Sequence, residues 1–377
     1  MRIICVIPNM GPGGAERAMA RLSAALSTKH DVVVVTWQAP DAVSFYTLPS
    51  SVKLVNLSLV GGAGLARGWR LFRRFSSLRN LVADLRPNLV LSFMDTTNVI
   101  AVTACLGTGV PVVVSERTDP AVHSLPVAKR ILRDVAYNFA DKVVVQTERV
   151  RSYFSPHLQS RIVVIPNPAP RPLRVAIPDR PGVNGRYRIM GLGRLSWEKG
   201  FDRLIAAFGS IAGLHPDWDL VIFGEGDQRS ELEGLVRALG LDDRIRLPGL
   251  TCAPEQELAA SHIMVLPSRY EGFPNALAEA VATGLPAVAF EGISGAEDLI
   301  KSECTGLHVC PQGDATQQLA SALHCLMADS AKRVRFGLEA QSHAAHWDPE
   351  MVHKRWEDVL LLAARKNPQI NGPEQKN

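Results

Sequence analysis

The sequence has 377 residues, of which 46% are apolar and 21% are charged, and its formal net charge is +4. This composition excludes a disordered or fibrous protein, and the length predicts two or three domains, with two favoured. The charge is unevenly shared, because residues 1–170 hold 19 Lys and Arg against 10 Asp and Glu, whereas residues 171–377 hold 22 against 27. The N-terminal half is therefore the basic one.

The N-terminal half alternates short apolar runs with longer helical patterns, which is typical of parallel βαβ units. The runs predict strands at 3–7, 32–36, 89–93, 110–114, 142–146 and 161–166. The first apolar run is too short for a secretory signal, and about 18 consecutive apolar residues occur nowhere. We therefore expect a cytosolic protein.

A glycine-rich segment, MGPGGAER, follows the first predicted strand and leads into a helical pattern at 18–26. Its Gly13 and Gly14 would let a ligand approach the backbone closely, next to the positive end of a helix. The segment is neither a G-x-G-x-x-G fingerprint nor a P-loop. Gly13 and Gly14 are candidate ligand contacts, and a simple tight turn is the alternative.

Much of the basic excess lies in one amphipathic segment, where arginines alternate with Leu, Trp and Phe. Such a segment fits a helix that lies on anionic lipid, and the alternative is a surface helix whose apolar stripe packs on its own domain. Nucleic acid is not an expected partner, because the excess is modest and no groove-reading motif accompanies it. The arginines are Arg67, Arg70, Arg73, Arg74 and Arg79.

Six prolines between positions 166 and 181 predict a linker, since proline continues neither a helix nor a central strand. A second alternating series follows, with helical patterns at 203–214, 229–239 and 316–327, and strands at 187–191, 220–223, 245–247, 263–266, 287–290 and 306–309. The fold class is therefore α/β, with two doubly wound parallel sheets. Such sheets bind ligands at the carboxyl ends of their strands, so we expect a cleft there, between the domains.

The first strand of the second half runs into the loop Gly193-Arg194-Leu-Ser-Trp-Glu-Lys199. An arginine and a lysine on one loop can converge on a diphosphate, although structural salt bridging by either is an equal alternative. Another loop, which carries Glu225, follows the next strand at the same predicted edge. We interpret it as lining the nucleotide side, with turn chemistry as the alternative.

The segment from Glu271 to Glu279 places two carboxylates eight positions apart around a predicted helix start. Pro274 fits the first helical turn, so the free N–H groups of the three residues that follow it would point at an incoming phosphate. Glu279 lies more than a turn inside the apolar helix, where sugar or ribose hydroxyls would offer it partners. The candidate donor contacts in this segment are Phe273, Pro274, Asn275, Ala276 and Leu277.

We expect no metal and no other cofactor. The pair Asp217 and Asp219 resembles a D-x-D metal motif but precedes its strand, and no cluster with zinc spacing occurs. The six cysteines are scattered, which indicates structural thiols.

Taken together, these motifs resemble the retaining GT-B glycosyltransferases of family 4, in order and spacing across nearly the whole chain. The motifs are the glycine-rich segment at 11–17, Gly193-Arg194 with Lys199-Gly200, and the E-x7-E signature from Glu271 to Glu279. SERTDP at 115–120 and YEGFP at 270–274 resemble the bacterial exopolysaccharide and lipid-linked oligosaccharide branch.

The resemblance implies two Rossmann-like domains, with the acceptor on residues 1–170 and the nucleotide sugar mainly on 171–350. A terminal helix at 351–366 would cross back to the first domain, and a disordered tail would follow at 367–377. Among the site residues, Arg194 and Lys199 would contact the diphosphate, Glu279 the ribose and Glu271 the transferred sugar. The resemblance also implies attack by the acceptor hydroxyl on the face that the phosphate leaves, without a protein nucleophile.

One departure concerns a histidine that many relatives carry after a middle strand of the first domain. This chain reads Ser115-Glu116-Arg117 there, and His123 is out of register. Glu116, Arg117 or Asp95 is the candidate on the acceptor side.

The leading hypothesis is a metal-independent, retaining transferase that moves a hexose or N-acetylhexosamine from a nucleotide sugar, UDP-linked in our expectation, to a membrane-associated glycan. The enzyme would be cytoplasmic and peripheral on the inner face of the plasma membrane. The alternatives are a GT-B transferase with a soluble sugar acceptor and a catalytically silent nucleotide-sugar-binding protein.

Overall fold

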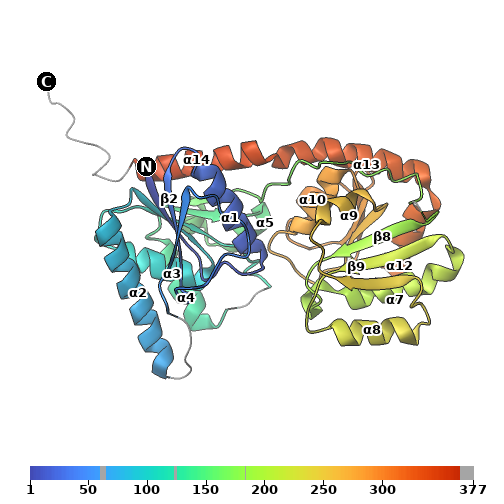
Figure 1. The fold of residues 1–377 in the computed structure, drawn as a ribbon, viewed down its shortest axis with the longest axis horizontal. Coiled ribbons are helices and arrows are strands. Elements are labelled where there is room, and N and C mark those ends of the chain that lie inside the picture. The colour runs from blue at the N-terminus through green and yellow to red at the C-terminus, as the bar shows by residue number, and fades with distance from the viewer. Residues whose placement is uncertain (60–64, 123–124, 183, 366–377) are drawn as a thin grey trace. The chain divides into compact units, whose positions relative to one another are not determined.

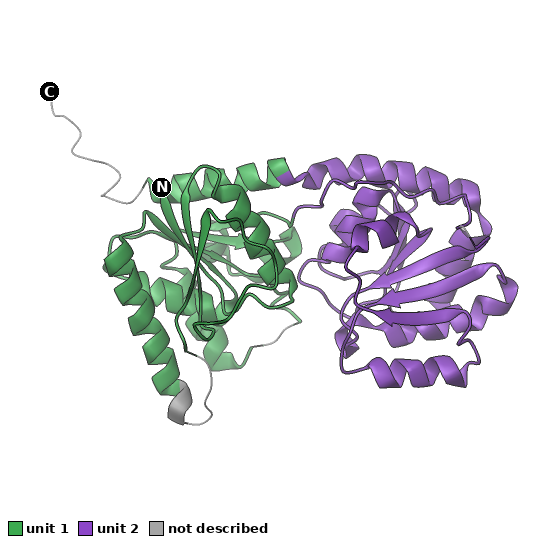
Figure 2. Ribbon diagram, in the orientation of Figure 1, with its two compact units in different colours: residues 1–167, 350–377 green, residues 168–349 purple. Residues whose placement is uncertain are grey.

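The computed structural model describes residues 1–59, 65–122, 125–182 and 184–365, and the chain forms two compact units (Figure 1; Figure 2). Unit 1 comprises residues 1–167 together with 350–377, and unit 2 comprises 168–349. The first boundary thus falls after Asn167 rather than after residue 170. The tail expected at 367–377 lies outside the described residues.

Unit 1 is built on a parallel seven-stranded sheet in the order β3-β2-β1-β4-β5-β6-β7. Its strands are β1 (Arg2–Val6), β2 (Asp31–Thr36), β3 (Val52–Asn56), β4 (Leu89–Phe93), β5 (Val112–Ser115), β6 (Lys142–Val145) and β7 (Ile162–Val164). Its helices are α1 (Gly14–Leu26), α2 (Leu65–Leu85), α3 (Asp95–Cys105), α4 (Val127–Tyr137), α5 (Glu148–Tyr153), α6 (Pro156–Gln159) and α14 (Pro349–Ala364).

Successive residues of the central strand β1 face opposite sides of the sheet, and each side has its own core. Ile3 and Cys5 belong to the core that α1 and α14 cover, whereas Ile4 and Val6 belong to the core under α2, α3 and α4 (Figure 1). Trp356 of α14 lies fully within the first core, with its ring centroid 5.8 Å from that of Phe93. The C-terminal helix therefore completes the hydrophobic core of the N-terminal unit.

Unit 2 contains a parallel six-stranded sheet in the order β10-β9-β8-β11-β12-β13. Its strands are β8 (Tyr187–Leu192), β9 (Trp218–Phe223), β10 (Ile245–Gly249), β11 (Ile263–Leu266), β12 (Ala287–Phe290) and β13 (Gly306–Val309). Its helices are η1 (Trp197–Lys199), α7 (Phe201–Ile211), η2 (Ala212–Leu214), α8 (Arg229–Ala238), α9 (Pro254–Ala259), α10 (Asn275–Thr283), α11 (Ala296–Leu299), α12 (Ala315–Ala328), α13 (Ser330–Ala344) and η3 (Ala345–Trp347).

Helices α7, α8 and α12 pack together on one side of this sheet, and α9, α10 and α13 pack on the other (Figure 1). The two sheets confirm the predicted doubly wound α/β class. Strand β3 is the one strand of the described residues that the sequence analysis missed. It is a short edge strand that carries Lys53 and Asn56, so it lacks the continuous apolar run of a buried parallel strand.

Each sheet reverses its winding direction once, which places a topological switch point between β1 and β4 in unit 1 and between β8 and β11 in unit 2. Loops at the carboxyl ends of the two strands that flank such a point diverge to opposite faces and leave a crevice for a ligand. The candidate residues can therefore be examined against these two edges.

Candidate functional site

The switch point of unit 2 brings together two of the predicted catalytic side chains, although they are 72 positions apart in the sequence. Lys199 ends η1 after strand β8, and Glu271 lies in the loop after β11. The Nζ atom of Lys199 lies 2.7 Å from Oε1 and 2.9 Å from Oε2 of Glu271. The hydroxyl of Ser268 also donates to Oε1, at 2.7 Å.

The two side chains of this ion pair are buried to different degrees. The Glu271 side chain is 9% exposed and that of Lys199 is 26% exposed, so the carboxylate is nearly desolvated while the ammonium still reaches solvent. A carboxylate in such a position needs its cation and its hydrogen bonds, because an unpaired buried charge is costly. Lys199 has three N–H donors, and an arriving anion at this edge can share them with Glu271.

The loops that carry these residues approach each other more closely than side chains would permit. Gly200 has a φ of +68°, and a Cβ there would lie 2.2 Å from the carbonyl oxygen of Pro267. Gly224 has a φ of +150°, and a Cβ there would lie 1.8 Å from the carbonyl oxygen of Gly193. The loop after β8 is thus held between the loops after β9 and β11, which fixes the start of η1.

Arg269 forms a second clamp at the same edge. It donates to both carboxylate oxygens of Asp202, at 2.9 and 2.7 Å, and its guanidinium lies 4.7 Å from the centroid of the Trp197 ring. The sequence analysis did not weigh Asp202 or Trp197, because the spacing from either to Arg269 corresponds to no motif. The Trp197 side chain is 57% exposed. In the sequence it lies between Arg194 and Lys199, the two residues predicted to contact the diphosphate.

Arg194 lies in the loop before η1 with an exposed side chain. Burial opposes the ionisation of Glu198, but the Ser196 hydroxyl and the charges of Lys199 and Arg194 outweigh it and lower the pKa of that carboxyl. Glu225, predicted to line the nucleotide side, lies at the same sheet edge and accepts two hydrogen bonds of 2.7 Å from Arg229.

The start of α10 corrects one expectation. Pro274 lies just before the helix, which begins at Asn275, and the Asn275 N–H donates to the Phe273 carbonyl at 3.0 Å. Within the described parts of the chain, the N–H groups of Ala276 and Leu277 have no acceptor. Two free amides rather than three therefore remain for an anion, because the turn at Pro274 consumes the first one.

Glu279 lies in the second turn of α10 and is 4% exposed, flanked by buried apolar residues. A buried carboxylate at this depth is consistent with the ribose contact that the resemblance implies. Asp219, by contrast, accepts from the Arg186 guanidinium at 2.9 Å and lies at the start of β9, away from this edge. In the described residues, no group of three or more His, Cys, Asp and Glu could hold a metal ion.

In unit 1, the glycine-rich loop leads from β1 to α1 as expected, with Gly13 just before the helix and Gly14 at its start. A Cβ on Gly13 would lie 2.1 Å from Oε2 of Glu16, which folds back over the loop. The hydroxyl of Tyr46 donates to the Gly13 carbonyl at 3.1 Å. The loop is thus fixed by side chains of its own unit.

Glu116 follows β5 but points into the unit rather than out of it. It is 2% exposed and accepts hydrogen bonds from Tyr137 Oη at 3.0 Å and Thr118 Oγ1 at 3.1 Å. Burial raises the pKa of the Glu116 carboxyl, and the nearby charge of Asp95 adds to this, while Arg133 opposes it. These contacts hold the Glu116 side chain inside unit 1.

Arg117 is also buried, over the ring of Phe93 at 4.6 Å, and it donates to Oδ1 of Asn167 at 2.5 Å. Burial lowers the pKa of its guanidinium to about 9, so the group stays charged at neutral pH. Asp95 begins α3 after β4 and is half-buried, with Oδ1 accepting from the Thr96 N–H at 2.6 Å. Of the three acceptor-side candidates, Asp95 is the one beside the switch point.

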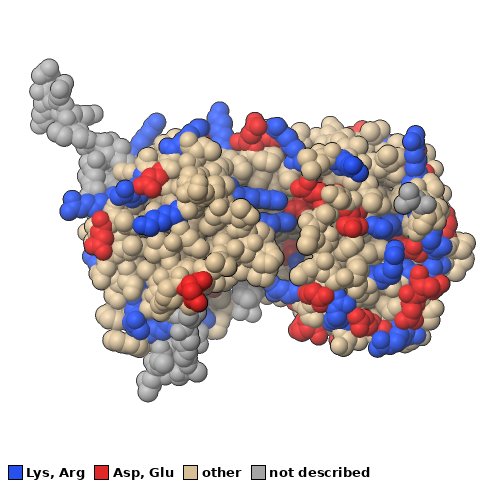
Figure 3. Space-filling view, viewed as in Figure 1, with Lys and Arg blue, Asp and Glu red and all other residues tan. Residues whose placement is uncertain are grey.

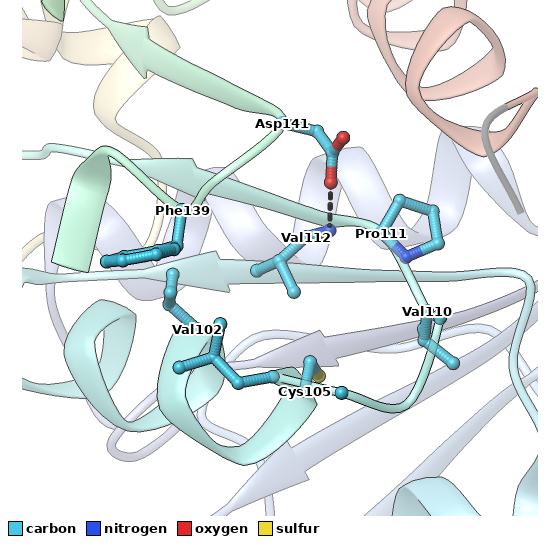
Figure 4. A pocket seen from close by; sticks show the side chains of 10 residues that line it. Val102, Cys105, Val110, Pro111, Val112, Phe139 and Asp141 are labelled. Atoms are coloured by element: carbon cyan, nitrogen blue, oxygen red, sulfur yellow. Dashed lines mark hydrogen bonds between the residues drawn. The ribbon is translucent and has the colours of Figure 1, made fainter.

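A pocket of about 230 Å³ lies at the opposite edge of the unit 1 sheet, where β5 and β6 begin (Figure 4). It contains none of the predicted site residues. Val102, Leu106, Val110 and Phe139 line it, and Asp141 accepts from the Val112 N–H at 2.9 Å.

The chain matches two family descriptions that together span most of its length. Residues 177–343 match Glycosyl transferases group 1, and residues 12–170 match Glycosyltransferase Family 4. The chain is a family 4 glycosyltransferase. Its motifs at Gly13, Arg194, Lys199 and the E-x7-E segment lie within these two matches.

Named relatives of this glycosyltransferase include bacterial polysaccharide and lipid-linked glycan enzymes. A Campylobacter jejuni N-acetylgalactosaminyltransferase, whose name gives a diphospho-undecaprenol acceptor, is 27% identical over 97% of this chain and 99% of its own length. An Erwinia amylovora amylovoran biosynthesis glycosyltransferase is 25% identical over 92% and 96%. A Streptomyces coelicolor exopolysaccharide phosphotransferase is 29% identical over 90% of this chain, which spans only 32% of that protein.

Solved structures establish the GT-B fold of the glycosyltransferase. A sucrose-phosphate synthase from Thermosynechococcus elongatus superposes with a TM-score of 0.79 at 18% identity, over 95% of this chain and 98% of that one. The Anabaena protein HepE, in complex with UDP and glucose, superposes with a TM-score of 0.76 at 18% identity, over 95% and 98%. The family matches thus confirm the expected membership of family 4, and the solved structures confirm the GT-B fold.

Proposed function

We propose that this glycosyltransferase transfers a hexose or N-acetylhexosamine from a UDP-linked donor to a lipid-linked glycan during surface polysaccharide assembly. In this proposal the configuration at the sugar is retained and no metal takes part. The observation that carries it is the pair of Lys199 and Glu271 at the switch point of unit 2, with the α10 N-terminus next in the sequence.

A nucleoside diphosphate fits the chemistry of this edge. Lys199 offers a compact charge and Arg194 a planar fork, both on the loop after β8, and the free amides of Ala276 and Leu277 suit phosphate oxygens. Glu279 would accept from ribose hydroxyls, and Glu271 from the transferred sugar. The UDP and UDP-glucose complexes of Anabaena HepE support this class of donor.

Positive charge at this edge matters most when the glycosidic bond breaks, because negative charge then develops on the departing diphosphate. The end of a helix contributes about 0.3–1 kcal/mol to an exposed anion and up to ~2 when the site is partly buried. Enzymes lower barriers by roughly 8–23 kcal/mol, so fixed cations must supply a larger share. Lys199 and Arg194 would do so, and Glu271 would keep Lys199 oriented before the donor arrives.

For retention, we propose that the acceptor hydroxyl attacks on the face from which the diphosphate leaves. The C–O bond to the donor phosphate breaks, the bond to the acceptor oxygen forms, and the acceptor proton passes to the departing phosphate. No protein nucleophile is needed. Asp95 remains as the acceptor-side carboxylate in unit 1.

The proposed acceptor rests on the relatives and on the surface of unit 1. The Campylobacter jejuni relative carries an undecaprenol-linked acceptor in its name. On the face shown in Figure 3, acidic side chains are few on unit 1 and many on unit 2, in line with the charge of the two halves. No helix of the described residues is long and apolar enough to cross a bilayer, so contact with lipid would be peripheral.

The arginines expected to meet anionic lipid do not all remain available. Arg74 donates to the Leu59 carbonyl at 3.1 Å, and Arg79 donates to the carbonyls of Ala104 and Leu106 at 3.0 and 2.9 Å. The side chain of Arg67 lies outside the described part of the chain. Because Arg74 and Arg79 bind backbone carbonyls of their own unit, fewer arginines of α2 remain to attract anionic lipid than the sequence indicates.

Transfer assays with a panel of UDP-sugars and undecaprenol-linked acceptors, in the presence of a chelator, test this function. We expect turnover with one of the UDP-sugars and loss of turnover in the Lys199→Ala variant. A product of inverted configuration would contradict retention, and activity that appears only with added divalent cation would contradict the metal-free mechanism. Equal turnover on a short sugar acceptor without a lipid would favour the alternative of a soluble acceptor.

A further inference from the structure

The turn that joins β4 to α3 holds an unfavourable backbone conformation at Met94. Its φ is 77° and its ψ is 139°, outside the small left-handed region that side chains permit and close to conformations that glycine alone adopts freely. Met94 directly precedes Asp95, the acceptor-side carboxylate beside the switch point of unit 1. A residue keeps such a conformation only when its surroundings hold it there, and these residues cluster at functional sites.

The side-chain amide of Asn98 holds this turn against the neighbouring strand. Its Nδ2 atom donates to the Ser115 carbonyl, at the end of β5, and to Tyr137 Oη, both at 2.9 Å. Its backbone N–H donates to the Met94 carbonyl at 2.8 Å, and the Met94 N–H donates to the Ser115 carbonyl at 3.2 Å. The strained residue and the Asn98 side chain therefore share one acceptor at the end of β5.

The orientation of the Asn98 amide follows from its partners. A backbone carbonyl can only accept, so the Ser115 carbonyl must face the NH2 group rather than the amide oxygen. Tyr137 Oη accepts the second N–H and donates its own hydrogen to Glu116 Oε2 at 3.0 Å. Burial and the charge of Glu116 raise the pKa of Tyr137, so its hydroxyl remains a donor at neutral pH. Both amide hydrogens of the fully buried Asn98 are thus committed.

A turn with no other role than to connect β4 to α3 would not need this arrangement. Glycine adopts a positive φ without strain, and its use would make the clamp unnecessary. The chain instead has a methionine there, together with a buried amide whose Oδ1 has no hydrogen-bond partner within the described residues. Both features cost free energy. They lie next to Asp95, and together they fix the direction in which the chain enters α3.

Asp95 is the functional group that this turn carries. Its side chain is half-buried, so part of it reaches solvent, and the neighbouring Thr96 is exposed. Oδ1 of Asp95 accepts from the Thr96 N–H at 2.6 Å. A carboxylate can accept several hydrogen bonds through its two oxygens, so Asp95 can also accept one from a sugar hydroxyl.

We propose that Asn98 is a positioning residue for the acceptor. By clamping the Met94 turn to β5, it fixes the Asp95 carboxylate where that group accepts a hydrogen bond from a hydroxyl of the acceptor sugar. This rests on the proposed transfer to a glycan. Asn98 is fully buried and acts through Asp95, while Tyr137 and Glu116 hold its amide in place. A misplacement of about 1 Å at a reacting site can cost about 10²-fold in rate, so the clamp matters without touching the acceptor.

Acceptor kinetics of the Asn98→Ala variant test the proposal. Its kcat/KM for the acceptor should fall by about 10- to 100-fold. The Kd for UDP, from isothermal titration, should stay within about twofold of wild type, because the proposed donor groups lie in unit 2. Asn88→Ala is the matched control, since Asn88 lies at the opposite end of β4, where its Oδ1 accepts from the Arg2 N–H at 2.6 Å. The control should leave kcat/KM unchanged.

A substitution that relieves the strain separates positioning from folding. Asn98→Ala should lower the Tm by about 4–8 °C, because two buried hydrogen bonds are lost. Adding Met94→Gly should recover at least about half of this loss, because glycine adopts the turn without strain. The kcat/KM of the double variant should nevertheless stay low, since nothing then fixes the turn. Met94→Gly alone keeps the clamp and should lower kcat/KM by no more than about threefold.

Two kinetic results would overturn the proposal. The first is a wild-type kcat/KM for the acceptor in Asn98→Ala. The second is recovery of kcat/KM together with the Tm in the double variant, which would make Asn98 a residue of the fold alone.

Hydrogen exchange gives a readout that needs no turnover. Backbone amides of residues 94–98 should exchange at least about tenfold faster in Asn98→Ala than in wild type, and unchanged exchange would also overturn the proposal. Absence of transfer by wild type with every donor and acceptor would instead refute the proposed function. The exchange rates would still decide whether Asn98 clamps the turn.

Discussion

The carboxyl edges of the two sheets in this glycosyltransferase treat charge differently. In unit 2, the partly exposed ammonium of Lys199 forms an ion pair with Glu271 at the carboxyl edge of the sheet. In unit 1, Glu116 and Arg117 occupy a similar place after a strand, yet both are buried and hydrogen-bonded within the unit. The comparison shows that a cation at the edge of unit 2 still reaches solvent, whereas the charges that follow β5 in unit 1 hold its own loops.

The largest expected effect tests how unit 1 is completed. Trp356→Ala should lower the free energy of unfolding of unit 1 by about 3–5 kcal/mol, since it empties the core between α14 and the sheet. Leu362→Ala on the same helix is the matched control, because Leu362 is 52% exposed. Hydrogen exchange of β1 and β4 amides would measure the loss, and protection equal to wild type would show that α14 is dispensable to that core.

The next effect sharpens the contrast in charge. Lys199→Ala should reduce kcat/KM by about 10²–10³-fold, the size typical when one donor to a developing oxyanion is removed. Lys53→Ala, at an exposed edge strand of unit 1, should leave kcat/KM unchanged. Steady-state kinetics at saturating acceptor would measure both variants. A fall in kcat/KM of less than about threefold in Lys199→Ala would refute a role of Lys199 in stabilising the departing diphosphate.

The two carboxylates of unit 2 should separate in kinetics. Glu271→Gln should lower kcat by about tenfold or more with donor affinity retained, because Lys199 loses its charged partner next to the transferred sugar. Glu279→Gln should instead weaken binding of the nucleoside diphosphate, since its assigned partner is the ribose. Isothermal titration alongside kcat measurements would separate them, and the reverse pattern would exchange the two assignments.

The smallest effect compares how the units respond to acid. Burial lowers the pKa of His262, and the charge of Arg333 adds to this, although the Arg180 carbonyl opposes it. The folded state then binds fewer protons than the unfolded one, so unit 2 should lose stability as pH falls through the ordinary histidine pKa of about 6.5. His262→Asn should reduce that pH dependence.

For Glu116 of unit 1 the sign is opposite, because burial raises the pKa of its carboxyl. The folded protein therefore binds a proton at Glu116 at a higher pH than the unfolded chain does. As the pH falls toward the ordinary carboxyl range, the free-energy cost of burying the charged carboxylate is removed. Hydrogen exchange at about pH 7 and about pH 5 would report both units in one sample. A pH dependence of unit 2 that stays the same in His262→Asn would contradict the assigned burial of that histidine.

The sheets were predictable because buried parallel strands are short apolar runs, and the loop after β8 because Arg194 and Lys199 lie on one segment. Contacts between distant segments were not, as Arg269 with Asp202 and Tyr137 with Glu116 show. Local backbone geometry at Pro274 also decided which amides stay free.

The most direct measurement of the central claim is the dissociation constant of the best-binding nucleoside diphosphate, in chelator, for wild type and for Arg194→Ala/Lys199→Ala. We predict tight binding by wild type without a divalent cation and a loss of at least about tenfold in the double variant, with affinity for the bare nucleoside unchanged. Equal affinity of the two proteins for the diphosphate would contradict the account.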